Sequence, residues 1–145
     1  MLAAPGLVGV AVLATFLQQI APPQADIRVQ SLELVRNPDR NVTARVVVTS
    51  DNNSVARAAR LELFLPVGVV VTQLGVGCHA VSVAGPSATA RVSCDLGDLP
   101  VRGVKSVALT TTTVPGGMPH RIAVFVESDT PDPIPTNNYS ERILQ

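Results

Sequence analysis

The sequence predicts an all-β protein built as an antiparallel two-sheet sandwich, preceded by a short hydrophobic N-terminal segment. The chain has 145 residues, which suits one domain of ordinary size. Of these residues 46% are hydrophobic but only 3% are aromatic. Valine and threonine are abundant, and their β-branched side chains fit a pleated sheet better than a helix. Short alternating runs recur between Gly, Pro and Asn turns, which is typical of a sandwich.

The N-terminal segment, residues 1–25, contains no charged side chain, and Leu7 to Leu17 form an almost unbroken apolar run. This run has the length of the hydrophobic region of an export signal. The small residue Ala25 stands immediately before Asp26, where the alternating pattern begins. Three interpretations remain open at this point: a signal removed after Ala25, a retained anchor or assembly segment, and a buried part of the domain. We expect the sandwich to occupy residues 26–145.

Nine strands are predicted at intervals of about a dozen residues. In chain order they span 26–34, 42–50, 59–65, 69–74, 78–83, 88–94, 104–114, 121–128 and 139–144. The first strand changes parity, because Ile27 and Val29 share one face whereas Leu32 and Leu34 fall on the other. This change predicts either a β-bulge or a switch of the strand between the two sheets near Gln30.

The second and third strands alternate regularly and are joined by a polar turn at residues 50–54. Every second residue is apolar, so one face of each strand is expected to be buried. The predicted inward residues are Val42, Ala44, Val46 and Val48 in the second strand, and Ala59, Leu61, Leu63 and Leu65 in the third. The third strand directs Arg60, Glu62 and Phe64 outward.

The fifth and sixth strands flank the turn at residues 85–87 and read as a hairpin that brings Cys78 opposite Cys94. An even number of cysteines in an exported chain predicts a disulfide between them. Closing this loop is expected to stabilise the fold by about 3 kcal/mol. A reduced, buried pair in a cytosolic protein is the alternative.

The later strands follow the same rules. One runs from Val104 into four consecutive threonines, and in the next Ile122, Val124 and Val126 alternate with polar and mixed positions. Regular short strands of this kind predict a sandwich of the immunoglobulin type.

Three motifs carry a family resemblance: Leu-Pro-x-Gly at residues 65–68, Cys-x-Leu-Gly-x-Leu at 94–99, and Asp-Pro-x-Pro-x-Asn-Asn at 132–138. With Cys78 between the first two, they resemble the immunoglobulin-like conserved repeat of bacterial and archaeal surface proteins. The resemblance spans residues 26–144. It implies a surface module to which no catalytic residues are assigned.

Two groups of residues have the side chains or spacing that cofactor chemistry requires, and each also has a structural explanation. Gly75 to Ala80 match the spacing of a dinucleotide-binding loop, but strand and turn residues follow, so no helix N-terminus is expected for a pyrophosphate. Cys78, His79, Cys94 and His120 are zinc-ligand types, but their spacing lacks a short Cys or His pair. We expect neither site, and we expect both histidines to be exposed.

Acidic loops supply a third candidate, a calcium site formed by Asp95 with Asp98 and Asp129 with Asp132. The adjacent prolines suit rigid turns, which is the interpretation we favour. The Asn-x-Ser/Thr triplets at Asn41, Asn52 and Asn138 are expected to be chance matches.

The functional prediction is a non-catalytic, exported or cell-surface structural or adhesion module without a cofactor or metal. Its expected partners are other protein subunits or surface proteins. Eleven basic and eleven acidic residues leave no net charge, so nucleic-acid binding is not expected. The alternative is a filament or pilus-like subunit in which residues 1–25 stay attached and mediate self-association or contact a membrane. A third class, a sugar- or peptide-binding module, is disfavoured because exposed aromatic residues usually stack on sugars, and only Phe64, Phe125 and Tyr139 are aromatic after residue 25.

Overall fold

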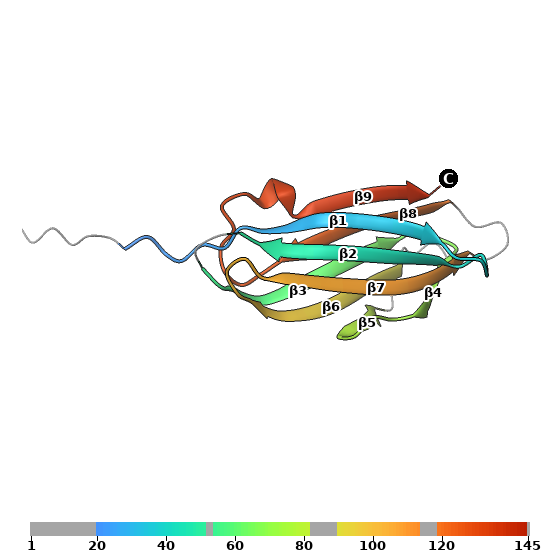
Figure 1. Ribbon diagram of the computed structural model, residues 1–145, viewed down its shortest axis with the longest axis horizontal. Helices are drawn as coiled ribbons and strands as arrows, with labels where there is room; N and C mark the ends of the chain where they lie inside the picture. The colour runs from blue at the N-terminus through green and yellow to red at the C-terminus, as the bar shows by residue number, and fades with distance from the viewer. Residues whose placement is uncertain (1–19, 52–53, 82–89, 114–118, 145) are drawn as a thin grey trace, which may run out of the picture.

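The computed structural model describes residues 20–51, 54–81, 90–113 and 119–144. Figure 1 shows them as an elongated β-sandwich. The strands are β1 (Ile27–Arg36), β2 (Val42–Ser50), β3 (Ala56–Leu65), β4 (Val69–Gln73), β5 (Cys78–Val81), β6 (Ala90–Leu99), β7 (Val104–Thr113), β8 (His120–Glu127) and β9 (Tyr139–Leu144), and a 3₁₀ turn, η1, spans Pro135–Asn137. Each predicted strand has a counterpart in this set, so the all-β prediction is confirmed.

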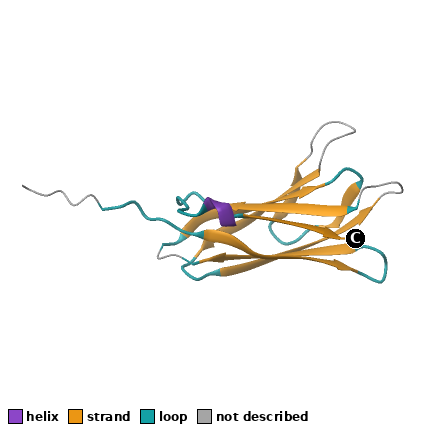
Figure 2. Cartoon of the chain, turned by 90° about the horizontal axis from the view of Figure 1, so that it is seen from above, coloured by secondary structure: helices purple, strands orange, loops and turns teal. Residues whose placement is uncertain are grey.

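The strands form two antiparallel sheets that pack face to face. One sheet has four strands in the order β1-β2-β7-β4, and the other has five in the order β5-β6-β3-β8-β9. Seen from above, the strands lie in two layers (Figure 2). No helix in the described ranges is long and apolar enough to cross a membrane.

The core between the sheets is aliphatic, as the composition predicts. The predicted inward residues of β2 and β3 are all buried, and those of β8 join them. The largest fully buried side chains are Ile27, Leu61, Leu63, Leu65, Leu99, Leu109, Ile122, Val42, Val46, Val48, Val92 and Val124. Every aromatic residue in the described ranges lies outside this core.

The predicted bulge in the first strand is confirmed. The register of β1 against β2 shifts between Val29 and Ser31, which leaves Gln30 without a partner residue. The extra residue reverses the parity, so Ile27 and Leu32 both point into the core.

β3 and β6 extend beyond their predicted ends and pair along an irregular ladder. Ala58 adopts a positive φ of 47° and Gly97 one of 66°. The Ala58 N–H donates to Asp98 Oδ1 at 2.9 Å, which supports the strained residue. Side-chain capping of this kind is not visible in an alternation pattern, and the prediction therefore stopped β6 at Cys94.

The start of the domain is fixed to the segment that follows β8. Ala25 is fully buried, and its N–H donates to the Pro131 carbonyl at 3.0 Å. Asn137 Nδ2 donates to Asp26 Oδ1 at 2.8 Å, and the Ile27 N–H donates to Asp132 Oδ2 at 3.1 Å. The core thus begins at Ala25. Residues 1–19 lie outside the described ranges, so the export, anchor and assembly interpretations remain predictions.

Candidate functional site: the outer face of the five-stranded sheet

The described aromatic residues share one location, the solvent side of the five-stranded sheet. Phe64 is on β3, Phe125 on β8 and Tyr139 on β9. Phe64 is 37% exposed, Tyr139 is 52% exposed, and Phe125 is half-buried. In a chain with an aliphatic core, the residues with the most apolar surface to bury are therefore placed at the surface.

The strand register brings the three rings together. Phe125 pairs directly with Tyr139, and Phe64 lies diagonal to Phe125 because its own partner is Ala123. Direct partners in an antiparallel sheet have Cβ atoms about 5 Å apart, and diagonal neighbours about 7–8 Å. The rings thus form a continuous line across β3, β8 and β9, which we call the aromatic strip.

The aromatic strip continues as a row of polar side chains across the remaining strands. The pairings place one residue of each strand in a single row: His79, Ser93, Glu62, Phe125 and Tyr139. Five strands at a spacing of about 4.8 Å make the row about 19 Å long. We call it the cross-strand row.

Ion pairs flank the cross-strand row and balance its charge. Arg91 Nε lies 3.1 Å from Glu62 Oε2, Arg60 Nε lies 3.2 Å from Glu127 Oε1, and Arg121 Nη2 lies 2.9 Å from Glu141 Oε1. The Arg91 contact is close but lacks hydrogen-bond geometry, so Glu62 Oε2 has no hydrogen-bond partner. The other oxygen of Glu62 accepts a 2.8 Å hydrogen bond from Ser93 Oγ. Pairs with this exposure add little stability.

The aromatic strip has a polar end at Tyr139. Its hydroxyl donates to Glu141 Oε2 at 2.8 Å. This hydrogen bond raises the pKa of Tyr139 and, together with the one from Arg121, lowers the pKa of Glu141. Tyr139 is therefore a neutral hydrogen-bonding group and Glu141 is ionised over the physiological pH range.

The other end of the cross-strand row opens into a shallow polar pocket of about 220 Å³. It is lined by Ala58, Arg60, His79, Ser93 and Asp95. The pocket offers a guanidinium, an imidazole, a hydroxyl and a carboxylate on one surface. Hydrogen-bond donors and acceptors are therefore available at the end of the cross-strand row opposite Tyr139.

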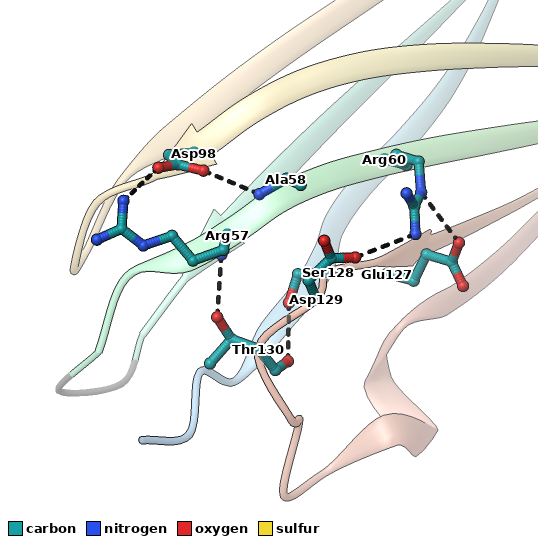
Figure 3. A network of polar contacts seen from close by, with 8 residues as sticks. All are labelled: Arg57, Ala58, Arg60, Asp98, Glu127, Ser128, Asp129 and Thr130. Carbon is teal, nitrogen blue, oxygen red and sulfur yellow. Dashed lines mark hydrogen bonds and ion pairs between the residues drawn. The ribbon is translucent and has the colours of Figure 1, made fainter. Parts of the chain in front are cut away.

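A polar network fixes the end of this sheet (Figure 3). Thr130 Oγ1 accepts from the Arg57 N–H at 3.0 Å and donates to the Val55 carbonyl at 2.9 Å, while Ser128 Oγ donates to the Thr130 carbonyl. Asp98 lies on the neighbouring strand, β6, and accepts hydrogen bonds from the backbone N–H of Ala58 and the side chain of Arg57. These hydrogen bonds hold the pKa of Asp98 below its usual value. These contacts keep β3, β6 and β8 in register below the pocket.

The cysteine prediction agrees with the structure. Cys78 and Cys94 are direct partners across β5 and β6, and they form a disulfide. Their sulfur atoms are thereby withdrawn from any zinc site. His79 lies at the surface beside the polar pocket, but His120 is only 4% exposed, so the expectation that both histidines are exposed is wrong for His120. Its position on the inward parity of Ile122 is the signal that the expectation overlooked.

The acidic loops act as turn and strand anchors, the interpretation the sequence favoured. Asp95 Oδ1 accepts the Gly97 N–H, and Asp132 Oδ1 accepts the Ile134 N–H at 2.7 Å. Asp98 pairs with Arg57 and Asp129 with Arg60. Within the ranges that the structure describes, no group of three acidic, histidine or cysteine side chains is arranged to hold a metal ion.

The other sequence candidates occupy ordinary structural positions. Gly75 to Ala80 lead into β5, a strand rather than a phosphate-binding helix. Asn138 is buried immediately before β9, and Asn41 is partly exposed. Asn52 and the predicted turn at 85–87 lie outside the described residues.

Comparison with known proteins supplies no family. No family model matches the chain. No curated protein matches it by sequence. The predicted membership in the immunoglobulin-like repeat family therefore remains a prediction.

Several solved structures are similar in fold. A chitin-binding domain from Streptomyces coelicolor shares 10% identity at a TM-score of 0.45, covering 68% of this chain and 90% of its own. A family GH18 chitinase from Chromobacterium violaceum shares 12% identity at a TM-score of 0.43, and an exo-β-N-acetylglucosaminidase from Vibrio harveyi shares 8% at 0.41. This chain covers 19% and 17% of the length of those two enzymes. At these identities the likeness concerns the fold alone.

The sequence reasoning placed Phe64 outside and Phe125 opposite the inward residues of its strand, yet it missed the aromatic strip. It also counted the small number of aromatics against a sugar ligand. Alternation gives the face of each residue but does not give the neighbouring strand, and β3 and β8 are far apart in the chain. One sequence feature could have revealed the aromatic strip: Phe64 and Phe125 fall on outward positions although the core is built from aliphatic residues.

Proposed function

We propose that this chain is a non-catalytic, exported surface-binding module that works through the outer face of its five-stranded sheet. The observation that carries the proposal is the aromatic strip. Phe64, Phe125 and Tyr139 each carry more apolar surface than an aliphatic core residue. Each would therefore give more hydrophobic stabilisation if it were buried in the core. Aromatic side chains gathered on an exposed, ordered sheet are typical of binding surfaces.

An oxidising compartment fits this role. Disulfides persist in exported proteins and are rare in the cytosol. The disulfide joins Cys78 on β5 to Cys94 on β6, and both strands belong to the sheet that carries the aromatic strip. An adhesive or structural role at the cell surface, the prediction made from the sequence, uses the same face.

The test is retention of the labelled full-length chain on cell-envelope fragments of the producing organism. We compare the natural chain with Phe64→Ala and Tyr139→Ala, which remove exposed rings without opening the core. Val104→Ala is the matched control, because Val104 is 60% exposed on the other sheet. Circular dichroism and thermal melts verify that all four proteins fold alike.

We expect both ring variants to lose most of their retention and the control to behave like the natural chain. Equal retention of all four proteins, or no retention of the natural chain, would show that this face is not the binding surface.

A further inference from the structure

We infer that the outer face of the five-stranded sheet binds a neutral polysaccharide chain lying across the strands, along the cross-strand row. This inference rests on the proposed function and specifies its ligand.

The rings provide a stacking platform. A pyranose ring presents a flat array of C–H groups, which packs against the face of an aromatic side chain. Phe125 and Tyr139 are adjacent and Phe64 is diagonal to Phe125, so successive rings are within reach of one extended ligand. The row runs for about 19 Å, which exceeds one sugar unit. A chain of sugars thus matches the site better than a monosaccharide.

The polar half of the row provides hydroxyl recognition. Beyond the rings come Glu62, Ser93 and His79, and the last two also line the polar pocket with Arg60 and Asp95. A sugar hydroxyl donates and accepts at the same time, and these groups supply both functions.

The charge balance selects a neutral ligand. Each arginine that flanks the rings is paired with a glutamate: Arg60 with Glu127, Arg91 with Glu62, and Arg121 with Glu141. A site for an anionic polymer would present unpaired cations. A hydroxyl-rich, uncharged polymer instead hydrogen-bonds to the pairs without breaking them.

The experiment uses the envelope-retention assay with the full-length chain and separates the ligand classes. Fragments are treated either with periodate, which cleaves vicinal diols of sugars, or with protease. Retention is also compared in low and high salt, because exposed charge interactions are screened by salt. Tyr139→Leu keeps an apolar side chain but removes the ring, and Tyr139→Phe keeps the ring.

We expect periodate to abolish retention, and protease and salt to leave it unchanged. We expect Tyr139→Leu to bind about tenfold more weakly, because a leucine side chain has no flat face to stack on a pyranose ring, whereas Tyr139→Phe stays within about threefold of the natural chain. Retention that survives periodate but not protease overturns the polysaccharide inference and leaves the surface-binding function standing. Strong salt sensitivity overturns neutrality. Unchanged binding by Tyr139→Leu overturns ring stacking. Failure of both alanine variants to reduce retention overturns the proposed function itself.

Discussion

Removing the disulfide is the perturbation whose effect the structure defines best. Cys78 and Cys94 are separated by 16 residues in the chain. In the chain-entropy treatment, opening a loop of this size gives the unfolded state about 10 cal/mol/K, which corresponds to about 3 kcal/mol at room temperature. The stability of a domain of this size is about 5–15 kcal/mol. The double variant Cys78→Ala/Cys94→Ala therefore loses a large fraction of its stability.

Changes in the folded state contribute little to this loss of stability. Among the strands that the structure describes, β5 is a short edge strand whose partner is β6, so the bond fixes one strand at the side of the sheet. The Cys94 sulfur is buried, and its replacement by Ala leaves a small gap. Reduction of the natural chain is the matched control, since it opens the bond while keeping both sulfur atoms in place.

Urea unfolding followed by circular dichroism measures the effect. We expect both the double variant and the reduced natural chain to lose about 3 kcal/mol, and the melting temperature to fall by about 10 °C. A loss below about 1 kcal/mol in both would refute the reasoning, because it would mean that the bond does not restrict the unfolded chain. A large loss in the variant alone would assign the effect to the gap at Cys94.

Four further predictions concern other parts of the molecule. Burial lowers the pKa of His120, so as the pH falls the unfolded state takes up the proton before the folded state does. Stability is therefore retained above the unfolded pKa of about 6.5 and declines below it. We expect the urea midpoint to fall between about pH 7.5 and 5.5 in the natural chain, and this fall to disappear in His120→Leu. Leu63→Ala removes a fully buried side chain from β3 and is expected to cost about 2–5 kcal/mol in urea unfolding, against less than about 0.5 kcal/mol for the exposed Val104→Ala. Asp132→Ala leaves the N–H groups of Ile27 and Ile134 without their acceptor and is expected to cost about 1–3 kcal/mol, with faster amide exchange at Ile27 as its local signature; unchanged exchange there would contradict the assigned contact. Finally, we expect the full-length chain to self-associate through its apolar residues 1–20, and a chain beginning at residue 20 to be folded and monomeric at micromolar concentration. Light scattering measures both. A full-length chain that is monomeric in detergent-free buffer rules out the filament alternative.

Local patterns were sufficient to predict the strands. In β2 and β3 the apolar residues recur at every second position, and a one-residue shift would expose all of them, so register and face are fixed together. The parity change between Val29 and Leu32 located the bulge for the same reason. The cysteines were predicted to face each other because a hairpin pairs residues at similar distances from its turn.

Contacts between distant parts of the chain were not predictable in this way. The structure gives the Asp-Pro-x-Pro-x-Asn-Asn motif a physical role that its sequence does not indicate. Asp132 and Asn137 hold Asp26 and Ile27, more than a hundred residues away in the chain. The aromatic strip depends on the β3–β8 pairing, which no local pattern specifies. Alternation predicted the faces of Phe64 and Phe125, but it did not predict which residues lie beside them.

The termini of the described chain have a mechanical consequence. Figure 1 shows the N-terminal segment leaving one end of the sandwich and β9 finishing at the other. Tension between these ends acts along the strands, while the hydrogen bonds of an antiparallel ladder lie perpendicular to them. The β1–β2 and β8–β9 ladders are then loaded in shear, with many bonds sharing the force rather than breaking one after another. The disulfide lies in β5 and β6, away from both ladders, so reduction changes the thermal stability of the domain while leaving its resistance to pulling largely intact.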